Sequence, residues 1–413
     1  MTKIRLIVLF LFAVFSFSLE AFSESEVIPL GPNEFLNGPS EKQRMRDSTV
    51  KIKEAIEISP TDYTNYEMLA IAYDYFGRYE DVIEALNKAI SFYPKHQRGI
   101  DALYGNLART YINLGKIDEA KPIIDKSIKL NPENIYNRKH LLNYYLLKEQ
   151  YQDLAVELEK MSTFDETADF YHDLYAFLFE RKTDQKEIIK IFKVIVNTTP
   201  KSHLAHKGLA SALRGYTRES ITKNFKVAIK EYKKALALKP DYIQTYIAIA
   251  DTYMLKALTE KDDKYFKDTI KWFDKAEKID PTHLKLIYAE SHFYLYVKRF
   301  DEAIEKLHAS FAEGNNSPEF MRLLADAYNA KAYFLYEEGE QLEDGLELIN
   351  KALSLFPDDA ILLSTKAEIL YKLRRYKTAH FYIKKALVLA PGNEEMQQDL
   401  AKIEKALGQE DGE

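Results

Sequence analysis

The chain has 413 residues, 30% of them charged, and a formal net charge of −6 at neutral pH. With only 14 Gly and 13 Pro, this composition is typical of an ordered protein and excludes an intrinsically disordered one. The small net charge, with Lys and Arg scattered among Asp and Glu, argues against nucleic acid as a partner. Because the sequence has no Cys, disulfides, thiolate metal sites, thiol nucleophiles and a cysteine-linked lipid anchor are excluded.

Residues 1–23 have the pattern of a secretory signal peptide. Two basic residues precede the uncharged run Leu6–Leu19, and the small residues Ala21 and Ser23 follow it. The run is shorter than the roughly 20 apolar residues that cross a bilayer core, so we expect cleavage after Ser23 rather than a retained anchor helix. The protein is therefore predicted to be exported, to the periplasm or the extracellular space. Membrane contact is expected only if this segment is not cleaved.

Residues 24–40 are predicted to form an extended linker. Prolines and glycines interrupt this segment at Pro29, Gly31, Pro32, Gly38 and Pro39. Residues of these two types do not continue a helix, so the folded part should begin near Glu41.

Prolines recur along residues 41–391 with a period close to 34. They are Pro60, Pro94, Pro132, Pro200, Pro240, Pro281, Pro357 and Pro391. Many follow an alanine by five residues, namely Ala55, Ala89, Ala235, Ala276, Ala352 and Ala386. A proline ends one helix and presets the turn to the next, while a small alanine lets two helix backbones approach closely. The pattern therefore predicts a helical hairpin repeated along the chain.

The unit that follows Pro60 illustrates the expected hairpin. Apolar residues spaced three or four apart form one stripe on each helix, and Gly77 separates the two helices. The expected stripes are Tyr66, Leu69, Ala70 and Tyr73 on the first helix, and Tyr79, Val82, Leu86 and Ala89 on the second.

These features resemble the tetratricopeptide repeat family, whose 34-residue unit has an aromatic, a Leu and a small residue in its first helix, Gly in the turn and Pro at its close. Residues 63–96 match this pattern nearly throughout. Further matches are Leu107, Ala108, Tyr111, Gly115, Ala120 and Pro132, then Tyr246, Ala250, Tyr253, Phe273 and Ala276, then Ala367, Tyr376 and Ala379. The resemblance implies an all-α fold, a right-handed superhelical solenoid of antiparallel helix pairs, with about nine to ten repeats over residues 41–391.

Some units depart from the pattern. The units near 135–168 and 284–317 are degenerate, with Glu166 and Asn315 where proline is expected. We expect extra residues in the turns between helices near 215–222, 259–264 and 337–343. Residues 392–413 are predicted to be a capping helix followed by an acidic tail, because terminal repeats need a polar outer face.

The sequence has none of the common catalytic or cofactor-binding motifs. The sequence has no Gly-rich phosphate loop, no nucleophile elbow and no zinc-protease motif. His203 and His206 lie three apart on a helix, but no acidic ligand stands at a fitting spacing, so we expect surface or rim histidines. We predict that the protein is not an enzyme and holds no metal and no cofactor.

In this family the first helix of each hairpin lines the concave face, so the resemblance implies that polar first-helix residues outside the packing stripe bind the partner. The partner-binding residues that we expect are Arg109, Lys139, Asn143, Tyr288, His292 and Arg322. Lys139 and Asn143 also resemble half of the carboxylate clamp by which some relatives hold chaperone C-termini. The other half is missing, because Asp173, Leu174 and Phe177 stand in its place, so ordinary polar groove residues are the favoured interpretation.

These observations favour a non-catalytic scaffold outside the cytoplasm that binds a protein or peptide in its concave groove, for example in envelope assembly or secretion. One alternative is a structural subunit held by its outer faces in an oligomeric or membrane-associated complex; an exposed apolar patch on the convex side would favour it. Another is a glycan-handling binder or enzyme, for which the 29 Tyr are the only hint.

Overall fold

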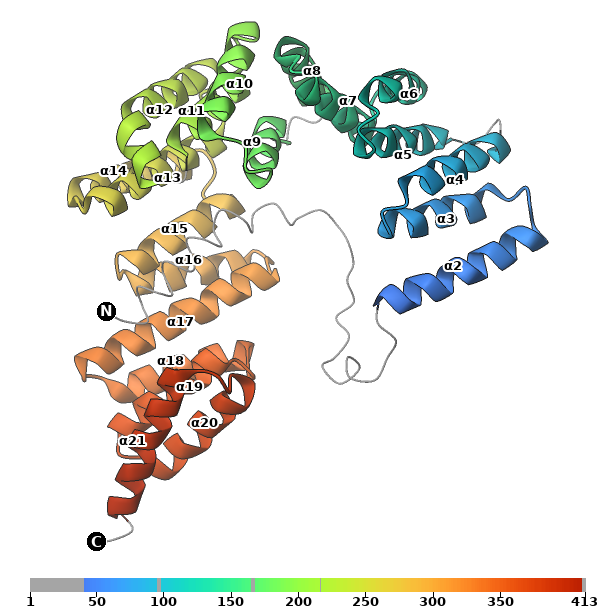
Figure 1. Ribbon diagram of the computed structural model, residues 1–413. Helices are drawn as coiled ribbons and strands as arrows, with labels where there is room; N and C mark the ends of the chain where they lie inside the picture. The colour runs from blue at the N-terminus through green and yellow to red at the C-terminus, as the bar shows by residue number, and fades with distance from the viewer. Residues whose placement is uncertain (1–40, 95–97, 165–167, 216, 411–413) are drawn as a thin grey trace. The chain divides into compact units, whose positions relative to one another are not determined.

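The computed structural model describes residues 41–94, 98–164, 168–215 and 217–410 (Figure 1). The secondary structure of these ranges is α-helical, and the helices form two compact units that adjoin in sequence at Pro240 and Asp241. The first described helix, α2, begins at Glu41. The predicted signal peptide and linker lie outside the described residues, and so does Glu166.

The N-terminal unit contains α2 (Glu41–Ile58), α3 (Tyr63–Tyr75), α4 (Tyr79–Phe92), α5 (Ile100–Asn113), α6 (Ile117–Leu130), α7 (Ile135–Leu147), α8 (Tyr151–Phe164), α9 (Phe170–Glu180), α10 (Gln185–Thr198), α11 (His203–Arg214) and α12 (Arg218–Leu238). Helices α3 and α4, α5 and α6, α7 and α8, and α11 and α12 pack as hairpins, and the second helices α4, α6 and α8 also contact the helix that follows. Helices α9 and α10 depart from this scheme, because α9 packs mainly against α11, and α10 packs against α8 and α11.

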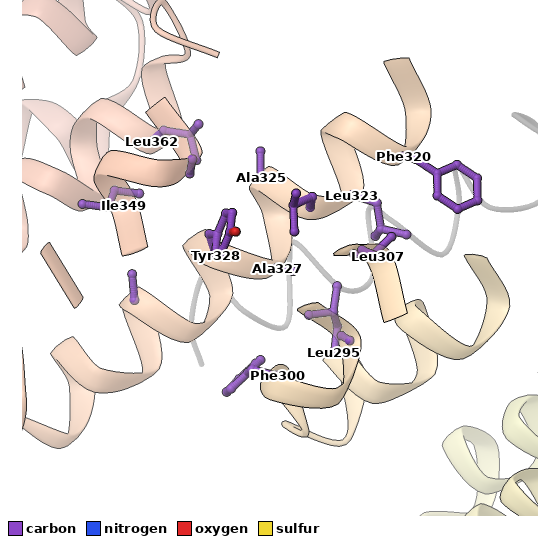
Figure 2. Packing of buried hydrophobic residues seen from close by; sticks show 14 of the residues in the cluster. Leu295, Phe300, Leu307, Phe320, Leu323, Ala325, Ala327, Tyr328, Ile349 and Leu362 are labelled. Atoms are coloured by element: carbon purple, nitrogen blue, oxygen red, sulfur yellow. The ribbon is translucent and has the colours of Figure 1, made fainter. Parts of the chain in front are cut away.

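The C-terminal unit contains α13 (Ile243–Glu260), α14 (Asp263–Glu277), α15 (Leu284–Tyr296), α16 (Phe300–Ala312), α17 (Pro318–Glu338), α18 (Leu342–Leu355), α19 (Ala360–Lys372), α20 (Tyr376–Leu389) and α21 (Glu394–Glu410). Its core is continuous from α15 to α19, and Figure 2 shows Phe320, Leu323 and Tyr328 of α17 between the neighbouring hairpins. Helix α21 packs on α20 at the end of the stack, as the predicted cap should. The fold is thus all-α, with antiparallel helix pairs stacked in each unit.

Burial confirms the predicted repeat register. In the first hairpin Leu69, Ala70 and Tyr73 are buried on α3, and Val82 and Leu86 are buried on α4. The alanines five residues before the prolines are buried at Ala89, Ala235, Ala276, Ala352 and Ala386. These small residues therefore mark the close helix contacts that the repeat requires.

The turn within a hairpin places one residue in the left-handed region. Gly77 and Gly115 occupy this position in the first two hairpins, with φ of 69° and 75°. Non-glycine residues with positive φ occupy it in later turns, namely Glu149, Lys182, Lys298 and Arg374. The backbone N–H of Gly77 donates to Asp74 O. Hydrogen bonds of this kind satisfy the last carbonyl groups of the helix, as in a helix C-cap.

The extra residues do not lie in turns, which corrects the sequence-based expectation. They lengthen helices instead, because α12 begins at Arg218, α13 continues to Glu260 and α17 continues to Glu338. The segments involved have strong helix formers and few Gly or Pro, so continuing the helix satisfies the backbone hydrogen bonds that a longer loop would leave to water.

A recurring hydrogen bond joins many first helices to the preceding proline. The side chains of Tyr66, Arg138, His206 and Gln397 each donate to the carbonyl oxygen of the proline six residues earlier, at 2.9, 2.6, 3.1 and 2.9 Å. His206 is consequently buried, with Nδ1 at 2.7 Å from Glu231 Oε2, and is not the surface or rim histidine that we expected. It takes the place that an aromatic residue has in the first hairpin.

Candidate functional site

All six predicted partner-binding residues lie on first helices. Arg109 is on α5, Lys139 and Asn143 are on α7, Tyr288 and His292 are on α15, and Arg322 is on α17. The first three belong to the N-terminal unit and the last three to the C-terminal unit, so they form two separate sets.

The two predicted cations of the N-terminal unit already have acidic partners on neighbouring first helices. Arg109 Nη2 lies 3.0 Å from Asp74 Oδ2 of α3, and Lys139 Nζ lies 3.2 Å from Asp173 Oδ2 of α9. Both cations remain about half-exposed, with side-chain exposures of 39% and 47%. Asp173 replaces a residue of the carboxylate clamp, so it neutralises the lysine that the clamp would use.

The surface between Arg109 and Asn143 is closely packed. At Gly105 of α5 an added Cβ would lie 2.1 Å from Asn137 Oδ1 of α7, so only glycine allows the two helices this approach. Burial, and then the nearby Arg109, lower the pKa of His140 to about 4, which leaves the imidazole neutral at neutral pH. Asn143 Oδ1 is buried and accepts no hydrogen bond from the described part of the chain.

A stripe of exposed apolar side chains on α3 was missed by the sequence analysis. Met68, Ile71 and Tyr75 are 52%, 60% and 44% exposed, and their spacing places them on one face of the helix. Asp74 lies within this stripe and joins it to Arg109 of α5 through the ion pair.

The stripe could have been found by counting positions between repeats. Ile71 stands 23 residues before the closing Pro94, and Arg109 stands 23 residues before Pro132. Ile71 is therefore the equivalent of Arg109 in the preceding unit. Helix α3 is apolar on most of its surface, and the apolar periodicity alone does not separate its packed face from its exposed one.

The predicted residues of the C-terminal unit are used largely for packing between helices. The rings of Tyr288 and His292 lie 4.6 Å apart, and Tyr288 also lies 5.7 Å from Phe320 of α17. Burial lowers the pKa of His292 to about 3, so this side chain is neutral. It carries no charge with which to attract an anionic partner.

Arg322 is likewise engaged within the chain. It lies 2.9 Å from Asp326, and it also pairs with Asp359, which caps the N-terminus of α19. Its guanidinium lies over the Phe356 ring, 5.3 Å from the centroid. Burial raises the pKa of Asp326 to about 6 in spite of Arg322. This set therefore connects α17 to α19, and its surface offers fewer open contacts than the α3 to α7 region.

Comparison with known families identifies the repeated unit. The family described as "Tetratricopeptide repeat" matches the sequence at residues 63–96 and 102–134, which contain the hairpins α3–α4 and α5–α6. These two hairpins are tetratricopeptide repeats. The helices from α7 to α20, apart from α9 and α10, pair in the same way with more divergent sequences.

Individual proteins are similar only at low identity. Protein IFIT1 homolog B from Homo sapiens is 22% identical over 162 residues, which make up 35% of this chain and 34% of that protein. The chain thus spans about a third of this curated relative. The structure of the human IFIT1 dimer with m7Gppp-AAAA matches 90% of this chain and 96% of that chain, at 13% identity and a TM-score of 0.43. PilW, a type IV pilus biogenesis factor, matches 56% of this chain and 97% of that chain, at 22% identity and a TM-score of 0.39.

The described part of the chain shows neither a metal cluster nor a membrane span. Across residues 41–410, apart from the three short gaps, no group of three His, Asp or Glu side chains is placed to hold a metal ion. In the same ranges no helix has the length and apolar character needed to cross a bilayer. What the N-terminal unit does present is a polar and apolar surface on adjacent first helices, and tetratricopeptide repeats typically use this face to bind proteins.

Proposed function

We propose that this protein is a non-catalytic scaffold that binds a protein or peptide on the first helices α3, α5 and α7. This α3–α7 surface consists of Met68, Ile71, Tyr75, Arg109, Lys139 and Asn143. The observation that carries the proposal is the exposed apolar stripe of α3 beside two half-exposed cations. Adjacent large apolar side chains on a soluble surface commonly mark an interaction site.

The residues favour a partner segment with an apolar anchor and an acidic group. Apolar side chains of the partner would cover the α3 stripe, and a carboxylate would compete with Asp74 or Asp173 for Arg109 and Lys139. Exposed ion pairs contribute only about 0–1 kcal/mol, so exchange of one carboxylate for another costs little.

The proposed setting lies outside the cytoplasm. Its support is the pattern of residues 1–23, in which basic residues, an uncharged run and small residues follow in the order of a cleavable export signal. Envelope assembly or secretion is a setting in which an exported scaffold of this kind would act. Mass spectrometry of the protein isolated from its cells should find Ser23 removed together with the residues before it. An intact Met1 would contradict cleavage.

Site-specific photocrosslinking in cells tests the binding surface. A photoreactive residue at Ile71 is expected to give an adduct with one protein partner, because this side chain lies in the exposed stripe. The matched control is Val156 on the second helix α8, which is similarly exposed at 58% but lies outside the α3–α7 surface. Reversal of charge with Arg109→Glu and Lys139→Glu should lower the yield from position 71 by about tenfold, equivalent to about 1.4 kcal/mol. Equal adducts from both positions, or unchanged yield in the reversed variant, would contradict the proposal.

One observation favours the alternative of a structural subunit. Phe381 and Val388 of α20 are 63% and 80% exposed, and they lie seven residues apart on the second helix of the last hairpin. Such a patch on an outer face can hold another protein copy or subunit. Sedimentation at increasing concentration should show self-association that Phe381→Ser with Val388→Ser removes. If the protein stays monomeric at all concentrations, the structural-subunit alternative is contradicted and the scaffold remains as the proposed function.

A further inference from the structure

Helix α12 exposes a row of lysines along one face. Lys223, Lys226, Lys230 and Lys233 are all exposed, and their spacing of three or four residues aligns them on one side of the helix. Its buried residues, among them Ile229 and Tyr232, lie on the opposite side against α11. We call these four residues the lysine stripe.

The lysine stripe is not balanced by acids. Within the described residues none of its four ammonium groups forms an ion pair. Some lysines elsewhere in this protein pair with an acid one turn away, as the partly buried Lys121 does with Asp125 and the exposed Lys351 with Glu347, both at 2.7 Å. Like charges at these spacings repel and destabilise a helix. The stripe therefore weakens α12 and contributes nothing to the packing of the hairpin.

Helix α10 extends the same charge. Lys186, Lys190 and Lys193 lie on its exposed face, where only Lys190 is paired, with Glu187 at 3.0 Å. Both α10 and α12 pack against α11, and their first turns approach at Gly215. An added Cβ there would lie 2.8 Å from Ser220 of α12 and 3.4 Å from Gln185 of α10. The two lysine rows therefore start from adjacent points of the N-terminal unit.

We propose that the lysine stripe docks this protein on an anionic membrane surface, a function separate from the binding proposed for the α3–α7 surface. Lysine ammonium groups are hydrated point charges, which suit a diffuse layer of lipid phosphates, whereas arginine would serve fork-shaped recognition of a single phosphate. Val227 is half-exposed within the stripe and can enter the headgroup region. The described residues of α10 and α12 include no exposed aromatic side chain on which nucleic-acid bases could stack, so a membrane fits better than RNA or DNA.

Vesicle binding tests this assignment with the full chain. Vesicles of phosphatidylcholine alone are compared with vesicles that also contain phosphatidylglycerol, at low and at high salt. The N-terminal segment, with Lys3 and Arg5, is the same in the wild type and in the variants, so the difference between them measures the stripe. Substitution of Lys223, Lys226, Lys230 and Lys233 by Gln should lower anionic partitioning by at least about tenfold, since each lysine near such a surface contributes. High salt should lower it in the wild-type protein as well.

A variant with the same change in net charge is the control. Lys88→Gln, Lys160→Gln, Lys384→Gln and Lys405→Gln remove four exposed lysines from four other helices. This scattered variant should keep wild-type partitioning, and circular dichroism should show both variants folded. Equal loss in the two variants would assign the binding to net charge and overturn the proposal. Binding of single-stranded RNA by the wild type, without preference for anionic vesicles, would also overturn it in favour of nucleic acid.

Discussion

Two ion-pair clusters with buried charges, one from each unit, differ in how their charges are matched. In the N-terminal unit the buried Arg138 pairs one-to-one with Glu157, donates to Pro132 O at 2.6 Å and stacks its guanidinium 4.7 Å from the Phe164 centroid. In the C-terminal unit Lys306 is shared, because its Nζ contacts both Glu277 and the buried Glu290, the latter at 2.6 Å. One ammonium group thus faces two carboxylates.

The consequence of this difference is electrostatic. Burial raises the pKa of Glu290 to about 7, and the nearby carboxylates of Glu277 and Asp274 act in the same direction, while Lys306 opposes them only in part. An ion pair of one cation and one carboxylate tolerates burial. Where two carboxylates share one ammonium group, the buried carboxylate of Glu290 takes up a proton near neutral pH. The same helix-pair architecture therefore accommodates a fixed ion pair in one unit and a titrating group in the other.

The largest effect is expected from breaking the matched pair. Arg138→Met should destabilise α7 and α8 by about 3–5 kcal/mol, because Glu157 would stay buried without a cation. The double variant Arg138→Met with Glu157→Leu should recover most of this loss, since neither charge then remains. Urea unfolding followed by hydrogen exchange of α7 and α8 measures both. If Arg138→Met is as stable as the wild type, water must hydrate the Glu157 carboxylate in place of Arg138.

The shared pair should make the C-terminal unit sensitive to pH. Glu290 binds its proton more tightly in the folded state than in the unfolded state, so its contribution to stability is lost as pH rises from about 4.5 to about 7. The expected loss is on the order of 2–3 kcal/mol. Glu290→Gln, which cannot titrate, should flatten this slope. Hydrogen exchange of α15 and α16 between pH 5 and 8 measures it as the difference between wild type and variant, because the opposite contribution of His292 on α15 is the same in both. Superimposable profiles for variant and wild type would refute the assignment.

Proline and alanine spacing predicted the repeat register correctly because each of those residues acts locally. The prolines of the repeat each stand just after a helix, although Pro122, outside that position, lies within α6. Ala89 is buried because a larger side chain would separate two helices. The extra residues were misplaced because helix propensity, rather than repeat length, decides whether an insertion becomes a turn. His206 could not be recognised as buried, since its partner Glu231 is distant in sequence.

The candidate site was predicted in position but not in environment. Helix placement follows from the repeat, so Arg109 and Lys139 lie on first helices as expected. Their ion pairs with Asp74 and Asp173 join different repeats, and a pattern within one repeat does not contain that information. The exposed stripe of α3 and the lysine stripe of α12 likewise depend on which side of each helix the neighbours cover.

The smallest effect concerns the hairpin turns, where the first two hairpins have Gly77 and Gly115 and the last has Arg374 at a φ of 60°. A side chain in the left-handed region costs about 1–2 kcal/mol relative to glycine, partly offset by the greater freedom of glycine in the unfolded chain. Arg374→Gly should therefore raise the stability of the C-terminal unit by up to about 1 kcal/mol. Lys278→Gly is the matched control, because Lys278 caps α14 with a right-handed φ of −66° and gains nothing from glycine. That control should lower stability by roughly 0.5–1 kcal/mol. Thermal unfolding of the two variants should shift in opposite directions, and a parallel decrease would mean that the Arg374 side chain stabilises the turn more than its backbone conformation costs.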